Sequence, residues 1–412
     1  MKPCNNRLVK LLQTKHKWRF KSRFRSRAFG WSASNLACHR LKEALTEIKK
    51  LAKSEPVQAA EGVVSLMERI WPALDQVDSS SGSLGSTVYW TLTELLPIVI
   101  DAPADRKTRD GWLDRLYQAI QEDGVDYLAR VKDDWGSLCG SVEVASQWAD
   151  RILPLLKTVW SDTRSGSYLR ETNMCLTCLL TAARHPELFE VLDLHRRPDW
   201  DDRRFGVRAL LAEGKTEEAL AYAEGSRALN QPNAAIDETC ERILLDAGRD
   251  AEAYEKYGLT ANESSTGLAT FRRIAKKYPS IEPRRILLDL AESFGDHGRW
   301  FAAAKDDGIL DLALHFAKTG STDPKTLSRA ARDLIETDAR FCLHVGRIAL
   351  QRMADGYGYE LTGIDVMDAY THFIKAAEKL GVAEDARKDA LAMAANAKQG
   401  STFAKALHCA MP

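Results

Sequence analysis

The sequence predicts an all-α fold, an irregular α-solenoid of stacked helix pairs, and three observations support that prediction. Residues 210–219 and 244–253 superimpose with Gly214 and Gly248 in register, 34 residues apart, a spacing typical of helix–turn–helix repeats. Apolar residues recur at three- and four-residue steps along most of the chain, as they do on one face of a helix. A succession of segments with the alternating pattern of half-buried strands is absent from the sequence.

The N-terminal half begins with a segment whose residue pattern fits either a strand or a helix. From Trp18 to Arg27, apolar or small residues alternate with cations, which matches a strand, but Phe20, Phe24 and Trp31 also suit one face of a helix. From Leu36 onward the helical period dominates. The expected helical stretches are 36–51, 63–74, 87–100, 112–120 and 142–160, the last of them kinked or split at Pro154.

Helix pairs continue through the C-terminal half. The glycine after the first helix permits a left-handed turn, and small residues such as Ala219 and Ala253 let the second helix approach closely. The interval from Gly248 to Gly298 is 50 residues rather than 34, so the array is irregular. The expected pairs are 168–183 with 186–194, 205–213 with 217–226, 236–246 with 251–257, two further hairpins over 287–318, and a last pair beyond 356–359.

Composition sets the domain plan and the broad class. The 412 residues are 45% hydrophobic and carry 58 basic and 58 acidic side chains. Residues 1–50 hold 14 Lys/Arg but only Glu43 and Glu47 as acids, so the remainder carries 44 basic and 56 acidic residues. We therefore expect a basic N-terminal arm (1–34), an N-terminal helical domain (35–160) and a C-terminal helical-repeat domain (161–412).

Cysteine usage and apolar runs indicate a cytoplasmic protein. The eight cysteines are scattered, and the Cys175–Cys178 pair lies in an apolar helical run, where thiols serve as small packing groups. No run reaches the roughly 18 apolar residues of a membrane span, so no membrane association is expected.

The basic arm is the first candidate site. Cations at this density suit phosphates, and interleaved aromatic rings suit stacking on exposed bases. Docking of the arm on the acidic body is the alternative. The candidate nucleic-acid-binding residues are Lys17, Trp18, Arg19, Phe20, Lys21, Arg23, Phe24, Arg25 and Arg27.

A metal site is the second candidate. Asp123 and Asp126 follow a helical stretch, and with Asp78 in the small-residue loop 78–85 they offer oxygen ligands for a hard cation. Such a site would support a metal-assisted hydrolase. The more common role of such a loop is to connect helices, with Asp78 as a cap.

No other catalytic pattern appears. The chain has no G-x-S-x-G elbow, no H-E-x-x-H pair and no phosphate-binding G-x-x-x-x-G-K-[ST] motif. We therefore expect a non-enzyme without a cofactor.

Short motifs carry a resemblance to a known family. Residues 64–71, 78–85 and 122–127, together with the Leu-Leu-x-x-Gly-[Lys/Arg] turns at Gly214 and Gly248, resemble an uncharacterised bacterial family of unknown function with tetratricopeptide-like helical repeats. The resemblance implies a bacterial, cytoplasmic, all-helical protein of the tetratricopeptide or HEAT type, with no known activity to carry over. The C-x-C…C-x-H zinc ligands found in some distant relatives are missing here.

The leading hypothesis is a non-enzymatic helical-repeat scaffold that binds a protein or peptide partner on a concave surface. Nucleic-acid association through the N-terminal arm is the second hypothesis, and a metal-assisted hydrolase is the third.

Overall fold

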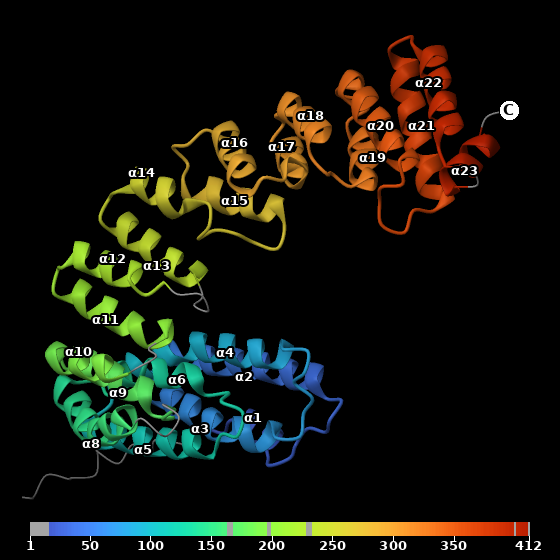
Figure 1. Ribbon diagram of the computed structural model, residues 1–412. Coiled ribbons are helices and arrows are strands. Elements are labelled where there is room, and N and C mark those ends of the chain that lie inside the picture. The colour runs from blue at the N-terminus through green and yellow to red at the C-terminus, as the bar shows by residue number, and fades with distance from the viewer. Residues whose placement is uncertain (1–15, 163–167, 196–198, 228–232, 399–400, 411–412) are drawn as a thin grey trace, which may run out of the picture. The chain divides into compact units, whose positions relative to one another are not determined.

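The fold is all-α. The computed structural model describes residues 16–162, 168–195, 199–227, 233–398 and 401–410, and these residues form helices joined by turns and loops, without a strand (Figure 1). The chain divides into two units, unit 1 (Met1–Gln231) and unit 2 (Pro232–Pro412).

Unit 1 is built from helices that pack mainly on helices close to them in the sequence, such as α2 on α3 and α4, α8 on α9, and α11 on α12. Its described helices are α1 (Phe20–Arg23), α2 (Ser34–Ala52), α3 (Pro56–Leu74), α4 (Ser83–Ile100), α5 (Arg106–Glu122), α6 (Ala129–Asp133), α7 (Trp135–Leu138), α8 (Val142–Ser161), α9 (Thr172–Thr181), α10 (His185–Leu194), α11 (Trp200–Ala212) and α12 (Thr216–Glu224).

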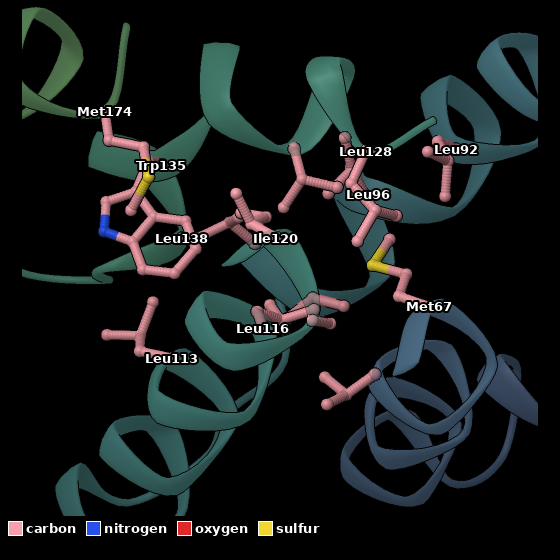
Figure 2. Close-up of a cluster of buried hydrophobic side chains, with 14 of the residues drawn as sticks. Met67, Leu92, Leu96, Leu113, Leu116, Ile120, Leu128, Trp135, Leu138 and Met174 are labelled. Carbon is pink, nitrogen blue, oxygen red and sulfur yellow. The ribbon is translucent and has the colours of Figure 1, made fainter. Parts of the chain in front are cut away.

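One apolar core runs through unit 1 from Trp18 to Ala209. Figure 2 shows part of it, a cluster of buried side chains that includes Leu96 of α4, Ile120 of α5 and Leu128. Each fully buried leucine or isoleucine stabilises the fold by about 1.5–3 kcal/mol. This core is continuous across residue 160, and the division into two units falls after residue 231. The boundary expected at 160/161 stays a prediction.

The N-terminal segment from residue 16 onward belongs to this core. Trp18 is only 5% exposed, and α1 packs on both α2 and α3. A Cβ atom at Gly62 of α3 would overlap the Trp18 indole, so this glycine provides the space that the ring occupies. The described part of the expected 1–34 arm is therefore part of unit 1, and residues 1–15 lie outside the described residues.

The helix assignments differ from the sequence prediction at several places, two of which are the expected split at Pro154 and the last helix pair. Helix α8 runs through Pro154 without a break, with Ile152 and Leu156 buried on either side of the proline. The C-terminal stretch beyond residue 359 forms α21, α22 and α23 rather than a single pair.

Unit 2 repeats the same local packing, for example α17 on α18, α19 on α20, and α20 on α21. Its described helices are α13 (Asn233–Asp246), α14 (Asp250–Ala253), the π-helical turn η1 (Tyr254–Gly258), α15 (Gly267–Lys277), α16 (Pro283–Phe294), the 3₁₀ turn η2 (His297–Trp300), α17 (Phe301–Asp306), α18 (Leu310–Thr319), α19 (Pro324–Asp333), α20 (Ala339–Ala354), α21 (Gly363–Lys379), α22 (Ala383–Asn396) and α23 (Thr402–Ala410).

The repeated glycine turn is confirmed in atomic detail. Gly214 and Gly248 have φ angles of 73° and 71°. In both turns the amide of the following residue donates to a carbonyl five residues earlier, Lys215 to Leu210 at 2.9 Å and Arg249 to Leu244 at 2.8 Å. This is the Schellman arrangement, which satisfies carbonyl groups at the end of a helix. The same turn recurs at Gly308, Gly356 and Gly381.

One such turn has alanine at its left-handed position. Ala183 has a φ angle of 54°, and the Arg184 amide donates to the Leu179 carbonyl at 2.9 Å. Because a Cβ atom disfavours the left-handed region and the Ala183 side chain is exposed, we expect Ala183→Gly to raise the free energy of unfolding by about 0.5–1 kcal/mol. Urea denaturation measures the change. Gly214→Ala is the reciprocal control and should lower stability by about 1 kcal/mol, whereas a loss of stability in Ala183→Gly would contradict the assignment.

Candidate functional site

The aromatic residues of the N-terminal segment are packing groups. Trp18, Phe20 and Phe24 are buried, and Phe24 contacts Phe29 edge-on with 5.5 Å between the ring centroids. Their rings are thus covered by α2 and α3 and are not available to stack on bases. The base-stacking role expected for these three residues is corrected to a role in the core.

The cations of this segment fall into two groups. Arg23 pairs with Glu43, and the Arg27 Nε lies 3.7 Å from the Asp75 carboxylate. Lys17, Arg19 and Arg25 are exposed. Lys21 faces Arg69 and Arg115, and burial followed by repulsion from Arg69 lowers its pKa. The cations that remain accessible to a partner are therefore a subset of the expected ones.

A groove between the N-terminal segment and α2 brings several of these cations together. We call it the basic groove. Its volume is about 790 Å³. Its charged and histidine lining residues are His16, Arg19, Arg23, His39, Lys42, Glu43, Glu47 and Lys50.

The two carboxylates of the basic groove are already occupied. Glu43 accepts hydrogen bonds from Arg23 and from Arg40, the latter at 2.7 Å. The hydrogen bond from Arg40, with the nearby cationic charges, lowers the pKa of Glu43. Glu47 accepts the backbone N–H of Arg19 at 2.9 Å. The side chains of Lys42 and Lys50, by contrast, form no ion pair with another described residue.

The three aspartates considered as metal ligands have separate local roles. Asp78 accepts the Ser80 amide at 2.9 Å and closes the loop before α4. Asp123 is buried and accepts the Leu128 amide at 2.8 Å, while Asp126 pairs with Lys132 at 2.8 Å. Burial raises the pKa of Asp123. Within the described ranges, no three His, Cys, Asp or Glu side chains gather as metal ligands would.

The cysteine pair is part of the core, as expected. Cys175 and Cys178 are both fully buried in α9. Burial raises the pKa of Cys175 to about 12. Burial also raises the pKa of Cys178 above the usual range of a thiol. Neither thiol has the exposed, thiolate-stabilising setting of a reactive cysteine.

A second groove lies in unit 2, and we call it the tyrosine groove. It has a volume of about 670 Å³ and lies between the α18–α19 connection, α20 and the loop after α20. Two large side chains at its edge are strongly exposed, Tyr357 at 65% and Tyr359 at 80%. The lining residues are Lys318, Gly320–Pro324, Arg347, Ile348, Gln351, Arg352, Asp355 and Tyr357–Tyr359.

The wall of the tyrosine groove opposite the tyrosine loop is held by fixed hydrogen bonds. Arg352 of α20 donates to the carbonyls of Ala317, at 2.6 Å, and of Gly320 and Thr322, which satisfies the C-terminal end of α18. Asp296 accepts the Ser321 hydroxyl at 3.0 Å. A Cβ atom at Gly320 would overlap the backbone of Gly298. The connection that lines the groove is therefore pre-organised.

The sequence pattern places a last helix pair beyond 356–359 but does not assign these residues to a site. The signal was present, because tyrosines alternating with glycines make an adaptable aromatic surface. The rest of the groove comes from the segments 318–324 and 347–355, which are about 30 residues apart and which only the fold brings together.

Among the described residues, no helix combines the length and the apolar character that crossing a bilayer requires. No family model and no curated protein matches the chain. Among solved structures, the chain is similar to a circular tandem repeat protein with novel repeat topology and enhanced subunit contact surfaces, at 14% identity. The alignment covers 90% of this chain and 81% of that chain, with a TM-score of 0.19. The assignment of the fold accordingly rests on the helices and turns described above.

Proposed function

We propose that the protein is a non-catalytic helical-repeat scaffold that binds a peptide segment of a partner protein in the tyrosine groove. The observation that carries the proposal is the exposure of Tyr357 and Tyr359 beside a preformed groove. Tyrosine is enriched at protein interfaces because a large ring contributes apolar contact while its hydroxyl hydrogen-bonds.

The chemistry of the groove indicates the kind of peptide. Ile348 offers an apolar contact, whereas Lys318, Asp323 and Asp355 at the edges supply charges of both signs. A mixed rim of this kind is typical of a protein interface with an apolar centre. We therefore expect an extended segment with an apolar or aromatic anchor and polar flanks.

Peptide selection tests the proposal directly. A short-peptide phage library is selected on the full chain, and the enriched peptides are measured by fluorescence anisotropy. We expect the double variant Tyr357→Ala/Tyr359→Ala to bind them at least about tenfold more weakly, the effect of losing about 1.4 kcal/mol of contact.

The matched control is Tyr89→Ala/Tyr168→Ala, which removes two exposed tyrosines of unit 1. This variant should bind the selected peptides as the parent does. Equal binding by the Tyr357/Tyr359 double variant, or selection of no peptide above the background, would refute the proposal.

A further inference from the structure

Three cations of the basic groove lack a described partner and share one surface. Lys42 and Lys50 lie on α2, two turns apart, and Arg19 lines the opposite wall. The side chains of these residues form no ion pair with another described residue, because Glu43 pairs with Arg23 and Arg40 and Glu47 accepts the backbone N–H of Arg19 rather than its guanidinium. Among the described lining residues, four Lys and Arg side chains face only two carboxylates, so this part of the groove carries a net positive charge.

The spacing of the cations along α2 matches several consecutive phosphates of a nucleic-acid strand. His39, Lys42 and Lys50 follow one face of α2, at steps of three and eight residues. At 1.5 Å per residue, Lys42 and Lys50 stand about 12 Å apart along the helix axis. One strand of a duplex presents a phosphate about every 3.4 Å of its axis, so this span faces about four phosphates.

The charge distribution of the chain favours binding of a polyanion at the basic groove rather than elsewhere on the protein. Residues 51–412 carry an excess of acids, 56 against 44 bases, and repel a phosphate backbone. The neighbouring aromatic residues Trp18 and Phe20 are buried, so neither of these rings is available to stack on a base. Contact would thus be made with phosphates alone.

We propose that the basic groove is a binding site for the sugar–phosphate backbone of double-stranded nucleic acid, contacted by Arg19, Lys42 and Lys50 without readout of sequence. The site is independent of the tyrosine groove and uses different residues. It also differs from the expected arm, because the aromatic residues are part of the core and α2 supplies two of the three contacts, Lys42 and Lys50.

Salt titration with a fluorescent duplex DNA and the full chain tests this proposal. Three phosphate contacts predict a slope of about −2.7 in a plot of log K against log salt between about 50 and 200 mM. The variant Lys42→Gln/Lys50→Gln should lower the magnitude of that slope by about 2, one for each lysine. Scrambling the DNA sequence should leave both the binding constant and the slope unchanged.

The control is Lys107→Gln/Lys276→Gln, which removes the same charge at two exposed lysines outside the groove. An equal loss in both double variants would show that net charge alone attracts the DNA and would overturn the site. Absence of duplex binding, or binding of phosphatidylserine vesicles in its place, would overturn the assignment to nucleic acid. Because all four lysines are exposed, we expect each double variant to retain its helices, and circular dichroism measures this.

Discussion

Replacing Arg109 with methionine is expected to lower the free energy of unfolding by about 3–5 kcal/mol, because several buried carbonyl groups lose their donor together. The guanidinium of Arg109 is buried between two helix ends. It donates to the carbonyl of Val99 in the last turn of α4 at 3.2 Å, to that of Ala102 just after α4 at 2.7 Å, and to that of Leu138 at the end of α7 at 3.1 Å. One side chain thus satisfies the C-terminal ends of both helices.

Denaturation in guanidinium chloride, followed by tryptophan fluorescence, measures the change in the free energy of unfolding of unit 1. Of the ten tryptophans, all except Trp300 precede residue 231, so the signal reports chiefly on unit 1. Arg109→Lys should lose less stability than Arg109→Met, because lysine keeps the positive charge, although it lacks the planar guanidinium that bonds several carbonyls at once.

Arg106→Met is the matched control for Arg109. Arg106 lies on the same helix, where it pairs with the exposed Asp110. This variant should change stability by no more than about 1 kcal/mol, because surface ion pairs contribute little. If Arg109→Met were as stable as the control, the assigned role would be wrong.

Replacing Glu241 with alanine is expected to destabilise unit 2 by about 3–5 kcal/mol. Glu241 is buried on α13 and accepts hydrogen bonds from Asn262 at 2.6 Å, Tyr278 at 2.7 Å and Lys277 at 2.7 Å. Asn262 follows the π-helical turn η1, Lys277 is the last residue of α15, and Tyr278 comes directly after that helix. The carboxylate therefore joins three consecutive pieces of unit 2, and burial with the hydrogen bond to Glu241 raises the pKa of Tyr278.

Hydrogen–deuterium exchange resolves this effect by segment. We expect residues 233–278 to lose protection in Glu241→Ala and to lose less in Glu241→Gln, which keeps one acceptor oxygen. Glu238→Ala is the control one turn earlier on α13, where the exposed carboxylate bonds to Arg273 at 2.5 Å. Equal protection in Glu241→Ala and Glu238→Ala would show that the network does not hold these segments together.

The parts of the fold that the sequence predicts are those encoded locally. The turns at Gly214 and Gly248 are visible because a left-handed position selects glycine and the apolar stripes resume on either side. The turn at Ala183 is harder to recognise, since alanine gives no such signal. The same backbone bonds form there nonetheless.

The parts that could not be predicted depend on distant partners. The alternation of Trp18 and Phe20 with cations fits an exposed binding arm as well as a buried segment, and the space left by Gly62 decides between them. Asp123 offers oxygens for a cation, but its burial and backbone donors come from the fold around it.

The burial of Trp18 has a practical consequence for recombinant work. A shortened protein that starts at residue 35, trimmed to remove an apparent tail, would lack Trp18, Phe20, Phe24 and Phe29 and would uncover the surfaces of α2 and α3 that they occupy. Apolar surface that becomes exposed in this way promotes aggregation. Poor solubility of such a fragment would then reflect a missing piece of its interior rather than the loss of a ligand.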